Sequence, residues 1–161
     1  MIDYMMILSR KHPGVAATCN GDTSVYSNIT FESTVITKET LDAKYIDCYK
    51  ANKNLLIDNR TQELISQGFV YNGSTFSLSS NAQTNWIGLK QASSLGLISF
   101  PYDVTTKDDL QHSIIDEADL TAFYATGLGT KSAHVASGRA LKILVNAETT
   151  IEGVDSIVDN R

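Results

Sequence analysis

Residues 37–78 have the sequence TKETLDAKYIDCYKANKNLLIDNRTQELISQGFVYNGSTFSL, which predicts a long helix, a glycine stop and a tight β-hairpin. Thr37 is a suitable N-cap, because its hydroxyl can accept a hydrogen bond from a first-turn backbone N–H. Gly68 stands where a residue with positive φ would end the helix. Between them, apolar residues recur at steps of three and four, as on one helix face. These residues are Leu41, Tyr45, Cys48, Leu55, Leu56, Leu64 and Ile65.

The dipeptide Asn72-Gly73 predicts the hairpin, since both residues tolerate the positive φ of a two-residue loop. Strand side chains alternate between faces, so this loop also sets which residues pair. The expected pairs are Phe69 with Phe76, Val70 with Thr75 and Tyr71 with Ser74. Phe69, Tyr71, Phe76 and Leu78 would then share one apolar face, and another element must cover it.

Composition limits the classes of function. The chain has 161 residues, a hydrophobic content of 42% and a charged content of 19%, which suits one folded domain with a weakly charged surface. A net charge of −5 argues against nucleic-acid binding, which depends on clustered Lys and Arg. We also expect no membrane association, because no apolar run reaches the roughly 18 residues that a bilayer requires. Two cysteines are too few for a disulfide framework and favour a reduced compartment.

The residues before the long helix predict a small α/β cap. Residues 3–12 favour a short helix, ended by His12-Pro13-Gly14, and residues 15–36 favour short strands broken by turns. A segment of this size does not bury a core alone, so we expect it to pack on the long helix or on another subunit.

The residues after the hairpin predict helices and one further strand pair. We expect a helix from Ser79 or Ser80 to Ser94, and strands at 97–105 and 110–115. A helix at 116–124 is followed by a joint at Gly127 and Gly129. A longer helix at about 130–147 would bury Val135, Leu141, Leu144 and Val145, and Thr149-Thr150-Ile151-Glu152 is a capping box for a last helix.

Together these elements predict an α+β protein in three segments. Residues 1–36 form the cap and residues 37–67 the linking helix. Residues 68–161 form a C-terminal domain in which short antiparallel strands, the hairpin 69–78 and the strands 97–115, pack with helices.

Catalytic and metal-binding motifs are weak. Residues 127–132, GLGTKS, lack the G-x-x-x-x-G-K-[ST] spacing of a phosphate loop, and we interpret them as a helix–helix joint. The three histidines, His12, His112 and His134, share no ligand spacing with the cysteines, so we predict no metal and no cofactor. No serine lies in a G-x-S-x-G motif. A catalytic set of serine, histidine and aspartate whose members are far apart in sequence stays open.

A group of acids leaves a hydrolase open as an alternative. A glycosidase needs two carboxylates at a fixed separation in a sugar-sized cleft. Turn positions and helix N-termini explain these acids more simply, because carboxylates stabilise helix N-termini. The acids are Asp103, Asp108, Asp109, Asp116, Glu117 and Asp119.

From residue 59 to residue 161 the chain resembles a phage domain family of unassigned function that occurs in tail-fibre and baseplate-associated proteins. The matching positions include Arg60, Leu64-Ile65, the hairpin 68–73, Phe76 and the helix segment 81–86. The match continues through the strands 97–115, the helix 119–124, Leu141-Lys142 and the helix start 147–150.

The first 50 residues resemble a second, short phage family encoded beside tail-fibre genes. The shared features are Tyr4, Leu8 and His12-Pro13-Gly14 in the opening helix and its stop, and the pattern T-x-E-x-L-D-A at 37–43. Neither family has a known catalytic motif, so the resemblance implies a location in the virion tail, after synthesis in the host cytoplasm, and not a reaction.

We therefore expect a non-enzymatic phage tail-associated virion protein, a baseplate or tail-fibre attachment component that acts through protein–protein contacts. Its partners would be other tail, baseplate or fibre proteins and further copies of itself. The alternatives are a tail-fibre assembly chaperone, a small cell-wall or glycan hydrolase, and a carbohydrate-binding module using Trp86, Tyr102 and Tyr124. The expected interface residues are Tyr4, Phe31, Tyr45, Ile46, Tyr49, Leu56 and Ile57.

Overall fold

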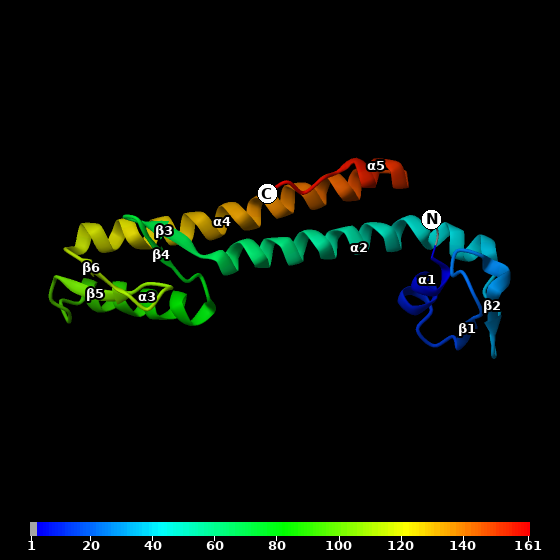
Figure 1. Ribbon diagram of the computed structural model, residues 1–161, viewed down its shortest axis with the longest axis horizontal. Coiled ribbons are helices and arrows are strands. Elements are labelled where there is room, and N and C mark those ends of the chain that lie inside the picture. The colour runs from blue at the N-terminus through cyan, green and yellow to red at the C-terminus, as the bar shows by residue number, and fades with distance from the viewer. Residues whose placement is uncertain (1–2) are drawn as a thin grey trace. The chain divides into compact units, whose positions relative to one another are not determined.

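The computed structural model describes residues 3–161 and has the predicted mixed α+β fold (Figure 1). Helices hold 58% of the residues and short antiparallel strand pairs 13%, so helices supply most of the packing surfaces. The sheets are the antiparallel pairs β1–β2, β3–β4 and β5–β6. The elements are α1 (Tyr4–Lys11), β1 (Ala17–Cys19), η1 (Tyr26–Asn28), β2 (Ile29–Phe31), α2 (Lys38–Gln67), β3 (Phe69–Tyr71), β4 (Ser74–Phe76), α3 (Ser80–Ser94), β5 (Tyr102–Thr105), β6 (Gln111–Ile114), α4 (Glu117–Ala147) and α5 (Ile151–Ser156).

Helix α2 begins as its sequence predicts. The backbone N–H of Thr40 donates to the Thr37 hydroxyl at 3.4 Å, and the N–H of Leu41 donates to the Thr37 carbonyl at 3.1 Å. Thr37 therefore supplies an acceptor for a first-turn donor that has no partner within the helix.

The end of α2 is closed by a glycine and a lysine. Gly68 has a φ of +89°, and a Cβ placed there would lie 2.1 Å from the carbonyl oxygen of Phe76. Lys107 Nζ donates to the carbonyls of Ser66 at 3.0 Å and Gln67 at 3.3 Å. A cation at this position is favourable, because the last helical carbonyls carry partial negative charge.

The β3–β4 hairpin has the predicted register, with Phe69 opposite Phe76, Val70 opposite Thr75 and Tyr71 opposite Ser74. Phe69 and Phe76 are 3% and 1% exposed, whereas Val70, on the opposite face, is 63% exposed. The two-residue loop thus selects which strand face is buried, as expected from the alternation of side chains.

The chain forms two compact units: residues 1–57 with 141–161, and residues 58–140. We call them the terminal unit and the central unit. This grouping differs from the three predicted segments, because the boundaries fall inside helices α2 and α4, and the last residues group with the first.

The terminal unit is built around α1, the first part of α2 and the end of the chain. Tyr4 Oη donates to Asp42 at 2.8 Å, which joins α1 to α2. A smaller apolar cluster of Ile57, Val145 and Val154 packs α2, α4 and α5 together (Figure 1). The main core residues of this unit are Tyr4, Ile7, Leu8, Ile29, Leu41, Tyr45 and Cys48.

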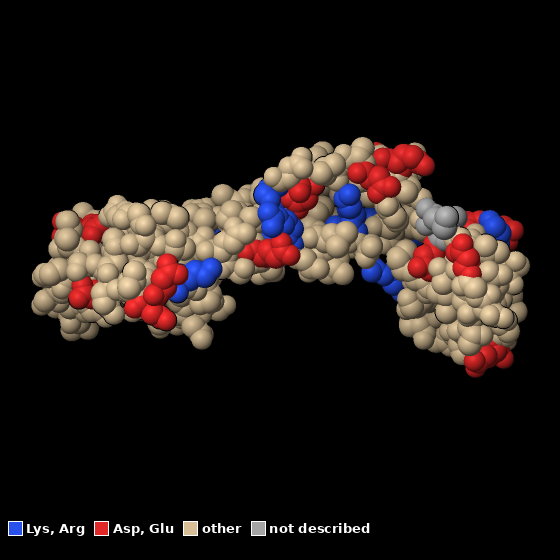
Figure 2. All heavy atoms as spheres, viewed as in Figure 1, with Lys and Arg blue, Asp and Glu red and all other residues tan. Residues whose placement is uncertain are grey.

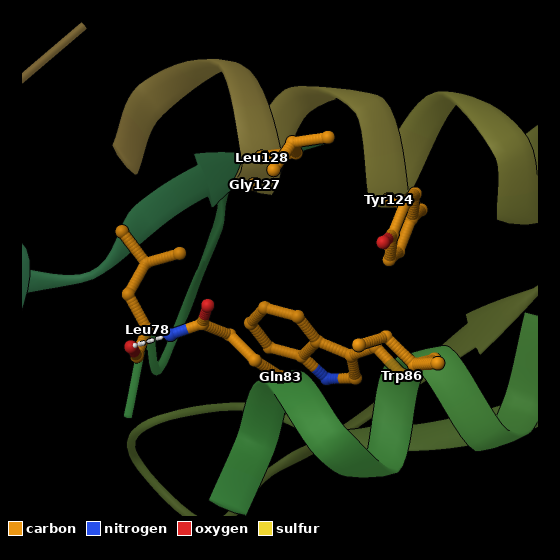
Figure 3. A pocket seen from close by; sticks show the side chains of 7 residues that line it. Leu78, Gln83, Trp86, Tyr124, Gly127 and Leu128 are labelled. Carbon is orange, nitrogen blue, oxygen red and sulfur yellow. Dashed lines mark hydrogen bonds between the residues drawn. The ribbon is translucent and has the colours of Figure 1, made fainter. Parts of the chain in front are cut away.

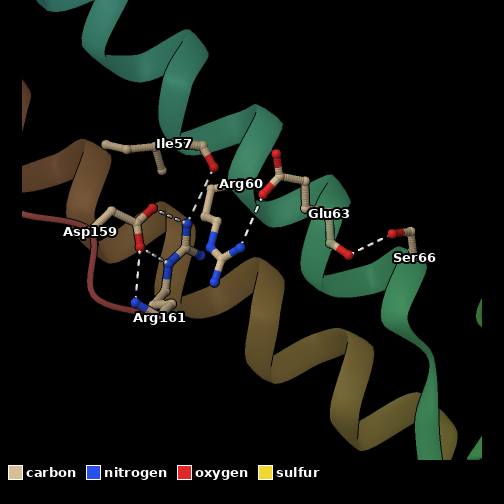
Figure 4. Close-up of polar contacts among 6 residues, drawn as sticks. All are labelled: Ile57, Arg60, Glu63, Ser66, Asp159 and Arg161. Carbon is tan, nitrogen blue, oxygen red and sulfur yellow. Dashed lines mark hydrogen bonds and ion pairs between the residues drawn. The ribbon is translucent and has the colours of Figure 1, made fainter.

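The last residue anchors the end of the chain in the terminal unit (Figure 4). The Arg161 guanidinium donates to Asp159 at 2.6 Å and to the Ile57 carbonyl at 3.2 Å. In the central unit, the same figure shows a local ion pair along α2, Arg60 with Glu63 at 3.0 Å.

The central unit is built around an aromatic core beneath the hairpin. Trp86 of α3 lies edge-on to Phe69 at 5.3 Å and to Phe123 at 5.3 Å between ring centres, so it covers the hairpin face as a core anchor. The buried members of this core are Phe69, Phe76, Leu78, Val104, Ile114, Leu120 and Phe123.

The structure of helix α4 contradicts the joint predicted at Gly127 and Gly129. The helix runs unbroken through Gly127 and Gly129, so the prediction of a break there is wrong. At Gly127, the Phe69 ring lies 3.0 Å and the Trp86 ring 3.4 Å from where a Cβ would be. This glycine therefore serves close packing and not a change of direction.

The buried face of α4 also differs from the predicted one. Val135 and Leu144 are 49% and 53% exposed, although the sequence pattern places both in the buried stripe. The buried positions are Leu120, Phe123, Gly127, Gly138 and Val145, at helical spacing. Two glycines occupy this stripe, so a search for large apolar residues selects the wrong face in part.

Two further boundaries differ by a few residues. Residues 97–101, predicted as part of a strand, precede β5, which pairs with β6 only from Tyr102 onward. The last helix is capped by Thr150, whose hydroxyl accepts from the Gly153 N–H at 3.1 Å, and not by the neighbouring Thr149.

Candidate functional site

The predicted interface residues fall into three groups in the terminal unit. Tyr4, Tyr45 and Ile57 are 2%, 4% and 1% exposed, and Leu56 is 58% exposed. Phe31, Ile46 and Tyr49 are half-buried. The chain's own fold therefore covers three of these side chains, and Leu56 is the one that it leaves open.

Tyr49, one of the half-buried residues, makes contacts within the chain that stabilise the fold. Its ring packs against Tyr45 at 5.9 Å between centres, and its hydroxyl donates to Asp155 at 2.5 Å. This hydrogen bond raises the pKa of Tyr49 to about 12, because the neutral phenol is the donor. Tyr49 thereby connects α2 to α5 within the terminal unit.

Large apolar side chains are nevertheless exposed on the helices of the terminal unit. Leu55 and Leu56 of α2 are 50% and 58% exposed, and Ile143 and Leu144 of α4 are 59% and 53% exposed. Sequence reasoning included only Leu56 among the interface residues. The sequence contains a sign of this exposure, because the apolar residues at 55–56 and at 143–144 are adjacent. Two adjacent apolar residues cannot both lie on one narrow helix face.

The central unit contains an apolar pocket between α3 and α4 (Figure 3). Its volume is about 120 Å³. Trp86 and Tyr124 lie on opposite sides of it (Figure 3). Ile87 and Leu128 also line the pocket, and each is 53% exposed, so we call these two residues its rim. The pocket is lined by Leu78, Gln83, Trp86, Ile87, Tyr124, Gly127 and Leu128.

The amide in the pocket wall is held by the chain itself. Gln83 Nε2 donates to the Leu78 carbonyl at 2.5 Å (Figure 3), and Gln83 Oε1 accepts from Lys131 Nζ at 2.7 Å. With this amide satisfied, the wall presents mainly carbon atoms. A dry cavity of about 150 Å³ lined by apolar side chains accommodates a benzene ring, so this pocket suits one aliphatic or aromatic side chain.

Sequence reasoning identified only part of this pocket. Trp86 and Tyr124 belonged to the alternative of a carbohydrate-binding module, but Ile87, Gly127 and Leu128 belonged to no predicted site. The sequence pattern could have identified two of these residues, because Ile87 lies off the apolar stripe of α3 and Leu128 lies off the buried stripe of α4. Both positions place a large apolar residue on a side that the fold leaves in water.

A serine–histidine contact is formed in the central unit. Ser74 Oγ and His112 Nδ1 lie 3.3 Å apart across β4 and β6. The nearby Asp119 carboxylate accepts from the Tyr71 hydroxyl and from the Ile115 N–H. These bonds lower the pKa of Asp119 and raise the pKa of Tyr71 to about 12. Asp119 thus supports Tyr71 and the start of α4, and not a Ser–His–Asp relay.

Three of the other acids considered for catalysis have local partners. Asp103 accepts from the Ser113 hydroxyl, Asp116 accepts from the Asp119 N–H at 2.8 Å, and Glu117 pairs with Lys90 at 3.4 Å. Asp109 has a φ of +59° in the turn that joins β5 to β6. Among residues 3–161, no three His, Cys, Asp or Glu side chains cluster in a way that could hold a metal ion.

Two further properties describe the surface. In the part of the chain that the structure describes, no helix combines the length and apolar character of a transmembrane span. Figure 2 shows charged side chains in isolated groups on the face drawn, with uncharged side chains between them. Recognition on such a face depends on shape and apolar area more than on charge.

Residues 48–158 match the domain of unknown function DUF4376. The chain belongs to this family. The DUF4376 match includes the hairpin, the pocket and the strand pair β5–β6, and begins within α2 at Cys48. No curated protein and no solved structure is significantly similar to the chain.

Proposed function

We propose that the chain is a phage tail-associated virion structural protein, part of the baseplate or of the tail-fibre attachment region. It acts through protein–protein contacts and not as an enzyme. The resemblance of residues 59–161 and of the first 50 residues to phage tail-associated families supports this location.

The apolar pocket of the central unit is the observation that carries the contact mechanism. Hot spots in protein interfaces are anchors that enter well-packed pockets, surrounded by contacts that exclude water. Here Trp86 is held rigidly by the aromatic core, and Ile87 and Leu128 provide an exposed apolar rim. A leucine, isoleucine or phenylalanine side chain of a neighbouring tail protein is the proposed occupant.

Repeated copies of the chain would associate through the terminal unit. Leu55, Leu56, Ile143 and Leu144 leave aliphatic surface in water, which is unfavourable by about 25 cal/mol per Å². Light scattering on the purified protein tests this contact. Leu56→Ser combined with Leu144→Ser should lower the measured mass, and a wild-type monomer at all concentrations would contradict self-association.

Mass spectrometry of purified virions, compared with the infected-cell lysate, tests the location. The protein should be present in both. Its presence in the lysate together with its absence from virions would exclude the structural role and favour a tail-fibre assembly chaperone.

A matched pair of variants tests the pocket. In phage that carry Leu128→Ser, virion incorporation should fall. Losing a hot-spot contact weakens binding by at least about 2 kcal/mol, which is about thirtyfold in affinity. The control is Leu110→Ser, which removes a 66% exposed leucine from the turn between β5 and β6. Equal incorporation of both variants would exclude the pocket as the contact.

A small cell-wall or glycan hydrolase is the second candidate, and the contact between Ser74 and His112 is the observation that favours it. The purified protein and its Ser74→Ala variant should then differ in the release of soluble fragments from host cell walls. Equal release by both would exclude this serine as a nucleophile.

A further inference from the structure

A second hollow of the central unit lies between α3 and β5. Its volume is about 270 Å³, just below the range of about 300–1,000 Å³ that is usual for small-molecule sites. Trp86 lines both this cleft and the apolar pocket. The cleft is lined by Ser77, Ala82, Asn85, Trp86, Leu89, Tyr102, Asp103, Val104 and Thr105.

Two aromatic side chains provide stacking surfaces in this cleft. Trp86 is fixed by its edge-on contacts with Phe69 and Phe123, and Tyr102 of β5 is 39% exposed. Aromatic faces carry partial negative charge and attract partially positive groups. The C–H groups on one face of a pyranose ring are such groups, and a flat sugar ring matches a flat indole.

One polar side chain of α3 faces the cleft beside Trp86. Among the residues that the structure describes, the Asn85 amide has no hydrogen-bond partner, so it remains available to a ligand. Asp103 and Ser113 are opposite each other on β5 and β6, and the Ser113 hydroxyl donates to Asp103 on the strand face opposite Tyr102 and Val104. The Asn85 amide supplies both donors and an acceptor, which match adjacent sugar hydroxyls.

Charge narrows the class of sugar. No Lys or Arg is among the lining residues, so the cleft offers the carboxylate of a uronic acid no cationic partner. Desolvating an unpaired carboxylate is unfavourable, so we expect neutral sugars to bind better than acidic ones. A cleft of this volume accommodates about one sugar ring.

We propose that this cleft binds a single neutral hexopyranose, stacked on Trp86 and Tyr102 and hydrogen-bonded by Asn85. The sugar can be free or can be the terminal residue of a glycan. This site is separate in its residues and in its chemistry from the apolar pocket, apart from the shared Trp86.

The single tryptophan of the chain makes the test direct. In the ¹⁵N-labelled full-length protein, the indole N–H of Trp86 gives one isolated signal. Titration with glucose, galactose, mannose or N-acetylglucosamine should shift this signal saturably for at least one sugar, with a Kd of about 1 mM. Glucuronic acid should bind more weakly. Tighter binding of an oligosaccharide ending in the same sugar identifies a glycan as the source, and equal binding identifies the free sugar.

Three variants locate the ligand. Asn85→Ala should weaken binding about fivefold, because it removes a hydrogen bond to the sugar. Asp103→Ala, on the opposite strand face, should leave binding unchanged. Leu128→Ser, at the rim of the apolar pocket, should leave binding unchanged. The proposal is overturned if no neutral sugar shifts the signal or if glucuronic acid binds as tightly as the neutral sugars. It is also overturned if Leu128→Ser weakens binding and Asn85→Ala does not. None of these outcomes bears on virion incorporation, so the two proposals fail independently.

Discussion

At the residue scale, the hydrogen bond from Tyr71 to Asp119 holds the hairpin against the start of α4. Tyr71 Oη also approaches the Asp119 carbonyl at 3.2 Å, so the phenol is bound to both the side chain and the backbone of Asp119. This bond raises the pKa of Tyr71 to about 12 and lowers the pKa of Asp119. This hydrogen bond therefore stabilises the protein most where Tyr71 is neutral and Asp119 is charged.

Tyr71→Phe should lower the free energy of unfolding at pH 7 by about 1–2 kcal/mol, since the hydrogen bond to a carboxylate is lost. The raised pKa of Tyr71 gives stability that is present below pH 10.0 and lost as pH rises through about 12. The lowered pKa of Asp119 gives stability that is present above pH 3.8 and lost as pH falls through the lowered value.

Urea unfolding followed by Trp86 fluorescence measures this difference. The gap between wild type and Tyr71→Phe should be largest near neutral pH and should shrink at about pH 3 and at about pH 11. Tyr102→Phe is the control, because its ring is 39% exposed on β5. A gap that stays constant with pH would exclude the proposed linkage.

At the element scale, α4 is a glycine-containing helix whose small residues allow aromatic packing. Gly127 lets Phe69 and Trp86 approach the helix backbone, whereas Gly129 has no atom within 4 Å of where a Cβ would be. In a helix interior, a glycine without a packing role costs about 1 kcal/mol relative to alanine. Two glycines of the same helix should thus respond to alanine in opposite ways.

Gly127→Ala should destabilise the protein by about 1–3 kcal/mol, because the added methyl group overpacks the aromatic core. Gly129→Ala should stabilise it by up to about 1 kcal/mol through helix propensity. Urea unfolding of both variants checks the prediction. A stabilising Gly127→Ala would mean that the rings of Phe69 and Trp86 move aside at little cost.

At the scale of the whole molecule, the two units have separate apolar cores. The hairpin, α3 and the strands β5 and β6 all lie within residues 58–140, as do all the buried members of the aromatic core. The terminal unit, in contrast, needs residues from both ends of the chain, since Ile57, Val145 and Val154 form one of its clusters.

A fragment of residues 58–140 should therefore fold on its own. Its Trp86 indole signal should coincide with that of the full-length protein, because the surroundings of Trp86 are retained. The complementary deletion of residues 141–161 should leave this signal unchanged while unfolding the terminal unit, observed as a loss of helical circular dichroism. A fragment 58–140 without a dispersed spectrum would contradict the independence of the central unit.

The sequence by itself determined the long helix and the hairpin. Thr37, Gly68 and Asn72-Gly73 act on backbone groups a few residues away, so their effects do not depend on the rest of the fold. The alternation of side chains then fixed the buried face of Phe69, Phe76 and Leu78, which another element had to cover. The α+β class followed from these local signals.

Only the tertiary structure decided which face of α4 is buried, where the pocket lies and which residues remain exposed. Burial of a helix face depends on partners that are distant in sequence, and glycine can be a buried position without appearing apolar. For the same reason, Tyr4, Tyr45 and Ile57, which the sequence offered to a partner, are covered by the chain's own termini and helices. The serine–histidine contact and the sugar-sized cleft likewise arise from strands and helices that sequence spacing does not bring together.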